Sequence, residues 1–356
     1  MRGIVYTGEG NAEVTDELDV RAPGPTEVLV RMVAAGVCHS DLSVLNGTIP
    51  WPSPSVLGHE GAGVVEAVGD AVVTCKPGDH VVVSTLANCG VCKWCNTGHP
   101  TWCRKSFGNM TQPFTYKGEP AWNFAATSSF GERIVVSQIQ AVPISPDIPL
   151  TSACLIACGV LTGVGAVLNR ARVRPGDTAA VFGSGGVGLN VIQALRLSQA
   201  TKIVAVDTLA SKEQLALDFG ATHFVNAADT DAVAAVKDLT GGGVTWAFEC
   251  VGHPAVLRNA VDVLDWGGMA VAVGVPKPTD ELSVVITALT HVDRGVMGTR
   301  YGSARPQFDI PAYVDLYLKG ELMLDELVTK TYPLDGFHDV VEDMEAGKLA
   351  RGVLEF

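Results

Sequence analysis

The sequence predicts two domains of different class: an antiparallel β domain and a doubly wound α/β domain with a parallel sheet. Residues 1 to about 87 are rich in β-branched residues, glycine and turn signals, which favours short antiparallel strands. From about 171 to 299, apolar strand-like runs alternate with helical patterns. The 356 residues are enough for two separate hydrophobic cores.

The composition is that of a globular protein, and its charge limits the partners. The formal net charge of −13 repels phosphate, which argues against nucleic acid or an anionic membrane surface as a partner. Residues 1–6 run directly into polar sequence without a signal-peptide pattern, so we expect a cytoplasmic protein. The uncharged stretch 148–169 contains Pro149 and several glycines, and it predicts buried helical segments instead of a membrane span.

The first strands are predicted where β-branched residues cluster. Glu27–Val33, Gly61–Val68 and His80–Ser84 are the clearest examples, and Arg133–Val136 is a later one. Their spacing suggests an antiparallel, barrel-like domain. Between these strands lie two loops that carry thiol and imidazole groups, around Cys38 and His59.

Four cysteines follow the third strand with two, two and seven residues between them. These are Cys89, Cys92, Cys95 and Cys103. Short spacings of this kind allow four thiolates to enclose one tetrahedral ion, which is typical of a structural zinc site. Iron–sulfur clusters usually have other spacings, and the polar residues between the cysteines argue against buried free thiols. We therefore predict a closed zinc site here.

A glycine-rich turn joins a predicted strand, Thr178–Phe182, to a helical pattern and a second strand, Lys202–Val206. The turn consists of Gly183, Ser184, Gly185, Gly186, Val187 and Gly188. One glycine permits the tight turn, one lets the backbone approach a pyrophosphate, and one lets helix and strand pack closely. The N-terminus of the helix then presents free N–H groups to the phosphates. The whole unit predicts dinucleotide binding.

The acidic residue that follows the second strand indicates which dinucleotide is bound. Asp207 stands nineteen residues after Gly188, where a carboxylate accepts the ribose hydroxyls and repels a 2′-phosphate. Thr208 adds no compensating charge, although Lys212 is close enough in sequence to reach the ribose region. We therefore predict NAD in preference to NADP.

Four further strands are predicted after this turn, and a last segment follows them. The strands are Phe219–Asn226, Thr245–Glu249, Met269–Val273 and Gly295–Gly298. The last segment carries a helical pattern around Ile310–Lys319 and a terminal strand, Gly352–Phe356. We expect this segment to return to the first domain. The expected boundaries are 1–160, 161–299 and 300–356.

Cys38, His59 and Cys158 together form a set of two thiolates and one imidazole, the ligand set of a catalytic zinc in alcohol dehydrogenases. The sequence resembles the zinc-dependent alcohol dehydrogenases of the medium-chain dehydrogenase/reductase superfamily over essentially its whole length. The matching motifs are residues 36–41, 58–63, the four-cysteine group, 158–163, the glycine turn with Asp207, and 273–276. The resemblance implies a GroES-like antiparallel β-barrel catalytic domain with an inserted Rossmann-fold NAD-binding domain.

The resemblance also implies roles for individual residues. Cys38, His59 and Cys158 would bind the catalytic zinc, Glu60 would be a nearby acid, Asp41 would accept a hydrogen bond from His59, and Ser40 would take the substrate proton. His39 and Arg351 would contact the pyrophosphate, Thr162 and Val187 would press the nicotinamide ring from behind, and Lys212 would lie near the ribose. Val273 would be a further cofactor-binding residue. The implied cofactors are two zinc ions per chain, one catalytic and one structural, and NAD.

Two positions depart from the family pattern. Ser43 stands where many relatives have the histidine that ends the proton relay, and a serine is no base near neutral pH. The relay would then run through water or the ribose hydroxyls. His39 stands where an arginine is frequent, and its phosphate contact would depend on pH.

The implied activity is reversible hydride transfer between NAD and a primary alcohol, which gives the aldehyde. Four residues, Thr85, Gly108, Phe124 and Ala125, are expected to line the pocket. Thr85 takes a position where enzymes for small alcohols often carry an aromatic residue, which favours a long, aromatic or terpenoid alcohol. The segment 114–130 resembles the longer loop of a dimeric branch and implies a homodimer, with a tetramer as the alternative.

Three alternatives remain open from the sequence. A thiol-adduct dehydrogenase of the formaldehyde type or a polyol dehydrogenase would share the fold, and only the pocket distinguishes them. A quinone or enoyl reductase would typically lack the zinc ligands. A non-catalytic NAD- and zinc-binding structural protein would not need Ser40 beside the three catalytic ligands.

Overall fold

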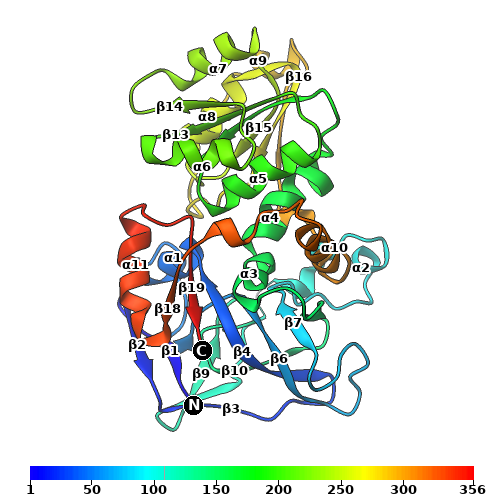
Figure 1. Cartoon of the computed structure of the whole chain (residues 1–356), viewed down its shortest axis with the longest axis vertical. Helices are drawn as coiled ribbons and strands as arrows, with labels where there is room; N and C mark the ends of the chain where they lie inside the picture. Colours follow the sequence, from blue (N-terminus) through cyan, green and yellow to red (C-terminus); the bar gives the residue numbers. More distant parts are fainter. Residues whose placement is uncertain (108) are drawn as a thin grey trace. The chain divides into compact units, whose positions relative to one another are not determined.

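The computed structural model describes residues 1–107 and 109–356, and the chain divides into two compact units (Figure 1). The first unit combines Met1–Leu161 with Arg305–Phe356, and the second unit is Thr162–Ala304. The second unit is therefore inserted into the sequence of the first. Residues 300–304 pack with the second unit. The backbone of Gly302 lies so close to Gly165 that a Cβ on Gly165 would be 2.5 Å from the Gly302 carbonyl oxygen.

The first unit is built on two sheets. Its strands are β1 Gly3–Gly8, β2 Asn11–Thr15, β3 Leu18–Val20, β4 Glu27–Val37, β5 Ser55–Val56, β6 Glu60–Val68, β7 His80–Val83, β8 Phe114–Tyr116, β9 Glu119–Asn123, β10 Arg133–Ser137, β11 Ala141–Pro143, β18 Val328–Pro333 and β19 Arg351–Glu355. The six-stranded sheet has the order β2-β1-β5-β9-β8-β3. The seven-stranded sheet has the order β11-β7-β6-β4-β19-β18, with β10 also paired to β4. Most pairs are antiparallel, which confirms the predicted β domain, and the pairs β5–β9 and β18–β19 are parallel.

Short helices connect these strands. They are α1 His39–Leu45, α2 Lys93–Asn96, η1 Pro100–Trp102, η2 Arg104–Ser106, α3 Leu150–Ala153, η3 Cys154–Ala157, α10 Pro306–Leu318, η7 Asp325–Leu327, η8 Leu334–Gly336 and α11 Phe337–Glu345. The helix α4, Gly159–Gly165, continues the chain from the first unit into the second. Only α10 exceeds ten residues among these helices of the described chain, so the sheets carry most of the packing in this unit.

The strand β4 runs through the middle of the seven-stranded sheet and is longer than predicted. Its side chains alternate, and Val28, Val30 and Met32 are almost fully buried in one apolar core with residues of β7. The strand continues to Val37 because its last part pairs with β19, which comes from the C-terminal segment. Sequence pattern alone does not reveal a partner so far along the chain.

The second unit holds a parallel six-stranded sheet. Its strands are β12 Thr178–Phe182, β13 Lys202–Asp207, β14 His223–Asn226, β15 Val244–Glu249, β16 Leu264–Ala272 and β17 Gly295–Gly298. Its helices are η4 Ala166–Ala171, α5 Gly186–Leu197, η5 Ala210–Lys212, α6 Glu213–Asp218, α7 Ala232–Thr240, α8 Pro254–Asp262, α9 Thr287–Thr290 and η6 Tyr301–Ser303. The strand order is β14-β13-β12-β15-β16-β17, and every pair is parallel. Numbered within the sheet, this is the 3-2-1-4-5-6 order of a Rossmann fold, as predicted.

One predicted strand is shorter than expected. The sequence predicts a strand over Phe219–Asn226, but β14 begins only at His223. Gly220 has a φ of +115° and closes α6, since the N–H groups that follow this helix still bond to its carbonyls. The apolar Phe219 is fully buried as the C-cap residue of α6 and not as part of a strand.

The uncharged stretch forms helices instead of one long span. Leu150–Ala157 and Gly159–Ala171 are two helical segments bent by 57° at Cys158. No single helix in the described part of the chain is long and apolar enough to cross a membrane, although this bent pair has the length and composition to do so. The bend leaves Cys158 between the two segments.

We predict that Gly188→Ala destabilises the second unit whereas Gly185→Ala does not. A Cβ at Gly188 would lie 1.8 Å from the Gly183 carbonyl oxygen, while a Cβ at Gly185 meets no atom within 4 Å. This clash should lower the free energy of unfolding of Gly188→Ala by roughly 3 kcal/mol. Scanning calorimetry would detect the change as a lower unfolding temperature. Equal unfolding temperatures for the two variants would contradict the close helix–strand packing.

Candidate active site and metal centres

The register of two central strands brings two predicted ligands together. β4 ends just before Cys38, and β6 begins just after His59. Gly36 of β4 is paired with Glu60 of β6. Because antiparallel partners lie side by side, this pairing puts Cys38 and His59 at the same edge of the sheet.

A buried carboxylate organises this edge. Asp41, in the first turn of α1, is fully buried and accepts the N–H of Cys38 at 3.0 Å and the N–H of Gly58 at 3.1 Å. Its Oδ1 also lies 3.1 Å from Nδ1 of His59. A carboxylate only accepts hydrogen bonds, so Nδ1 carries a proton, and in the neutral ring this leaves the lone pair on Nε2. Asp41 therefore orients the ring as metal binding requires.

Cys158 and Glu60 complete a cluster of four donors. One donor atom from each of Cys38, His59, Glu60 and Cys158 lies within 4.8 Å of all the others. Among the described residues, no hydrogen-bond partner faces the buried Nε2 of His59. A hydrogen bond between the thiols lowers the pKa of Cys38 well below its usual value and raises that of Cys158. An unpartnered imidazole nitrogen beside two thiols fits a zinc ion.

Glu60 is enclosed together with one cation. Its carboxylate is fully buried, and Oε1 lies 3.5 Å from Nη2 of Arg351, which is itself almost fully buried. Burial raises the pKa of Glu60 to about 7, and the charge of Arg351 opposes this shift. A divalent cation on the neighbouring donors would lower it as well. The sequence assigned Arg351 to the pyrophosphate and missed this pairing, for which no local signal exists.

The four-cysteine group converges on one point. The Sγ atoms of Cys92 and Cys95 are 3.6 Å apart, and those of Cys89 and Cys103 are 3.7 Å apart. Four sulfurs around one zinc ion at a bond length of about 2.3 Å would be about 3.8 Å from one another. A backbone N–H from Val91 lowers the pKa of Cys89 to about 6, which favours a thiolate. The group therefore fits the predicted structural zinc.

The glycine-rich turn is tight and leads directly into a helix, as the sequence predicts for a dinucleotide-binding turn. Gly183 has a φ of +92°, which favours glycine, and α5 begins at Gly186. Asp207, at the end of β13, accepts the backbone N–H of Ser184 at 2.8 Å and lies 3.1 Å from Nζ of Lys212. The carboxylate is thus held at the turn, with Lys212 beside it.

The other predicted cofactor residues lie in several elements. Thr162 is half-buried in α4, and Val187 is half-buried in the first turn of α5. These helices touch closely, because a Cβ at Gly163 would lie 2.6 Å from the Val187 oxygen. Val273 follows β16 and donates its N–H to the oxygen of Glu249, whereas His39 is exposed in α1.

The predicted pocket residues differ in burial. Thr85 is 5% exposed, and its Oγ1 has no hydrogen-bond partner among the described residues. Phe124 is buried edge-on against His59, with ring centroids 5.6 Å apart, and Ala125 next to it has a φ of +50°. Oγ of Ser40 lies 4.0 Å from Sγ of Cys38. Gly108 lies outside the described residues.

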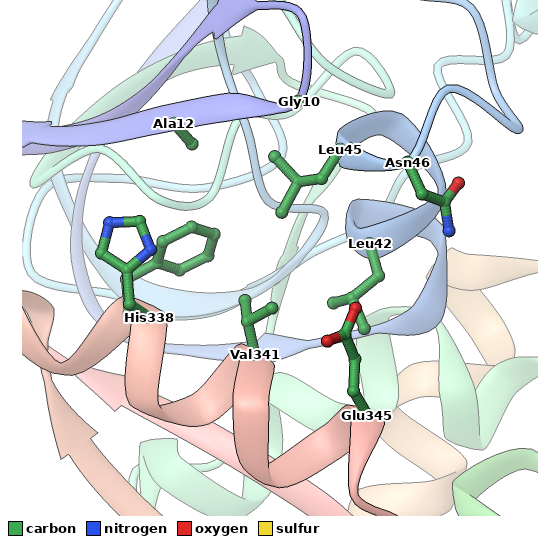
Figure 2. A pocket seen from close by; sticks show the side chains of 9 residues that line it. Gly10, Ala12, Leu42, Leu45, Asn46, His338, Val341 and Glu345 are labelled. Carbon is green, nitrogen blue, oxygen red and sulfur yellow. The ribbon is translucent and has the colours of Figure 1, made fainter.

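A separate hollow of about 260 Å³ lies in the first unit (Figure 2). Figure 2 shows side chains from α1 and α11 pointing into it. Its lining residues are Gly10, Ala12, Leu42, Leu45, Asn46, Phe337, His338, Val341 and Glu345. None of them belongs to the predicted site, so this hollow is distinct from the metal centre.

Two segments of the chain match models of known protein families. Residues 24–146 match the family model "Alcohol dehydrogenase GroES-like domain", and residues 186–319 match "Zinc-binding dehydrogenase". S-(hydroxymethyl)glutathione dehydrogenase of Haemophilus influenzae is 38% identical over 96% of this chain and 93% of its own length.

Two solved structures have the same fold over nearly their whole length. A benzyl alcohol dehydrogenase from Acinetobacter calcoaceticus has a TM-score of 0.94 and 34% identity, covering 100% of this chain and 99% of its own. An alcohol dehydrogenase zinc-binding domain protein from Burkholderia ambifaria has a TM-score of 0.94 and 38% identity, covering 100% and 98%. The similarity therefore includes both units.

We predict that Asp41→Asn weakens metal binding at the cluster of Cys38, His59 and Cys158. A single amide oxygen cannot accept all the hydrogen bonds that the carboxylate accepts, so the affinity should fall by about 10- to 100-fold. The measurement is the rate at which a chelator removes zinc. The four-cysteine site should keep its zinc, and the exposed Asp70→Asn should behave as the unchanged protein; equal rates for both variants would contradict the role of Asp41.

Proposed function

We propose, given that the chain belongs to the zinc-dependent alcohol dehydrogenases of the medium-chain superfamily, that it oxidises primary, fairly hydrophobic alcohols with NAD. The products are the aldehyde and reduced NAD, and the reaction is reversible. The observation that carries this proposal is the cluster of two thiols and one oriented imidazole within 4.8 Å.

Each residue of the site has a role in the proposed alcohol oxidation. When bound, zinc supplies a Lewis acid that lowers the pKa of a substrate hydroxyl, and NAD supplies the hydride acceptor. Cys38, His59 and Cys158 would hold the metal, and the hydroxyl of Ser40 would take the substrate proton. Ser43, one turn further along α1, cannot act as a base near neutral pH, so the proton leaves through water or the ribose hydroxyls. The carbinol carbon would thus give up a hydride, for which bound NAD would be the acceptor, and the carbinol oxygen would give up its proton through Ser40.

Three observations support a substrate larger than ethanol. Thr85 is a small side chain, and the resemblance implies that it lies at a pocket position where enzymes for small alcohols often have an aromatic residue. One structural relative, with 34% identity, is named a benzyl alcohol dehydrogenase. Phe124, buried against His59, offers an apolar wall that favours an aromatic or terpenoid alcohol.

A thiol-adduct substrate is the second candidate, because the relative from Haemophilus influenzae is named an S-(hydroxymethyl)glutathione dehydrogenase. That substrate is an anion. The formal net charge of −13 opposes its approach. A polyol substrate would need several hydroxyl-binding groups in the pocket, of which Thr85 offers one.

We predict that purified protein reduces NAD with benzyl alcohol and geraniol at a higher kcat/KM than with ethanol or S-(hydroxymethyl)glutathione. Thr85→Phe should fill the pocket and lower kcat/KM for the two larger alcohols by about tenfold or more, with little effect on ethanol. Thr85→Val keeps the size and is the matched control. A preference of the unchanged protein for ethanol or for the glutathione adduct would refute the proposed substrate class.

We also propose a homodimer formed through the edge of the parallel sheet. In the part of the chain that the structure describes, β17 is the last strand of that sheet and pairs only with β16. Val296 of this strand is 37% exposed, and Trp266 and Ile286 of the same unit are 76% and 73% exposed. An exposed strand edge with apolar residues is a template for pairing with a second copy.

The expected mass in solution is that of a dimer, and Val296→Lys should shift it toward the monomer because a charge on the edge opposes pairing. Light scattering after size-exclusion chromatography measures the mass. Val73→Lys, on an 89% exposed side chain of the first unit, is the control. A dimer that persists in Val296→Lys would show that another surface holds the copies together.

A further inference from the structure

The hollow in the first unit (Figure 2) lies between two helices, α1 and α11, which face each other without closing the gap. Three residues of one face of α1 line it, together with side chains of α11 and with Gly10 and Ala12 from the turn between β1 and β2. Because glycine and alanine fill little of the gap, a volume of about 260 Å³ remains. A small organic molecule fits into such a volume.

The inner walls of the hollow are apolar. Leu42 and Phe337 are buried members of one apolar core, and the half-buried Leu45 and Val341 pack against the same core. All four side chains also line the hollow. A ligand would therefore be able to bury an apolar body here, of the size of one aromatic ring or a short alkyl chain.

Oxygen acceptors gather at one end of the hollow. Figure 2 shows Asn46 and Glu345 on the same side, with His338 on the other. In the described chain, the carboxylate of Glu345 has no hydrogen-bond or ion-pair partner, and no donor faces the carbonyl oxygen of Leu45. A Cβ at Gly10 would lie 3.1 Å from that carbonyl oxygen. Oδ1 of Asn46 accepts the N–H of Thr48 at 3.0 Å and keeps a second lone pair.

The C-terminal ends of both helices make this end of the hollow more negative. α1 ends at Leu45 and α11 ends at Glu345, and neither of these two described helices has a basic residue in its last turn. The C-terminus of a helix carries a partial negative charge, which favours a cation beside it. Lys348, three residues after Glu345, lies 2.9 Å from Asp343 and compensates that carboxylate instead. The acceptors at the hollow thus lack a positive partner in the described chain.

We propose that the hollow binds a small organic cation, which consists of a primary ammonium group on a short aromatic or alkyl body. The ammonium has three N–H donors, and the oxygens of Glu345, Leu45 and Asn46 accept them. The apolar body packs between Leu45 and Val341. The formal net charge of −13 favours the approach of a cation and opposes that of an anion. This binding site is separate from the proposed alcohol oxidation and does not depend on it.

The test is a ligand-observed NMR titration of the zinc-loaded protein near neutral pH, with 2-phenylethylammonium as the probe. Its dissociation constant should be on the order of 1 mM, because so small a ligand gains little affinity. The anion 3-phenylpropionate has a similar body and should bind about tenfold more weakly or not at all.

Variants of α11 locate the bound probe. Glu345→Gln should weaken its binding about tenfold, because a charge-assisted hydrogen bond is lost. Glu342→Gln changes an exposed carboxylate of the same helix that does not line the hollow, so it is the matched control and should bind the probe unchanged. Val341→Trp should fill the hollow and abolish binding, and its unfolding temperature shows whether the variant is folded.

Four outcomes would overturn the proposal. The first is an absence of saturable binding to the unchanged protein, and the second is equal binding of the cation and the anion. The third is unchanged binding in Glu345→Gln or in folded Val341→Trp, because the probe would then bind elsewhere on the protein. The fourth is a lower mass of Val341→Trp in light scattering, which would show that a second copy of the chain occupies the hollow. The Glu345→Gln result decides the matter alone if Val341→Trp does not fold.

Discussion

The pairing of β4 with both β6 and β19 is the constraint on which the catalytic cluster depends. β4 ends just before Cys38, β6 starts just after His59, and β19 starts at Arg351, and the register of the sheet brings these ends to one edge. Hydrogen bonds along three strands hold this edge, so the donors are placed by rigid elements. Only Cys158 comes from a different kind of element, the break between two bent helical segments.

Burial makes the charges of this edge depend on one another. Asp41, Glu60 and the thiols are taken out of water, which is costly for charged groups without partners. Asp41 is compensated by backbone N–H groups and by His59, and Glu60 by Arg351. The thiols of Cys38 and Cys158 and the unpartnered Nε2 of His59 remain without such compensation among the described residues. A divalent cation is the partner that would satisfy all of these donors at once.

The parts of the site that were predicted from sequence are those whose members lie close together in the chain. The four cysteines fall within fifteen residues, and the glycine turn runs directly from β12 into α5, so spacing alone identifies both. The catalytic ligands lie far apart in the chain, so spacing does not identify them. Individually, Cys38, His59 and Cys158 are ordinary residues, and it was the resemblance to a family that joined them.

The same difference between local and long-range features applies to the prediction of the fold. Most strands were predicted because β-branched residues recur with the right period, but β14 is shorter than predicted, since Gly220 ends a helix inside an apolar run. The extension of β4 to Val37 was also missed, because its partner β19 lies more than three hundred residues further on. Periodicity reports which face of a segment is apolar, and it carries no information on which distant segment will cover that face.

The sequence by itself therefore determined the two-domain class, the dinucleotide turn with its acid, and the four-cysteine site, since each depends on local spacing and backbone freedom. The tertiary structure alone decided the pairing of Glu60 with Arg351 and the clearance that Gly36 and Gly159 leave for it. These are contacts between segments remote in the chain. They arise from strand register, which many side chains set together and no single motif records.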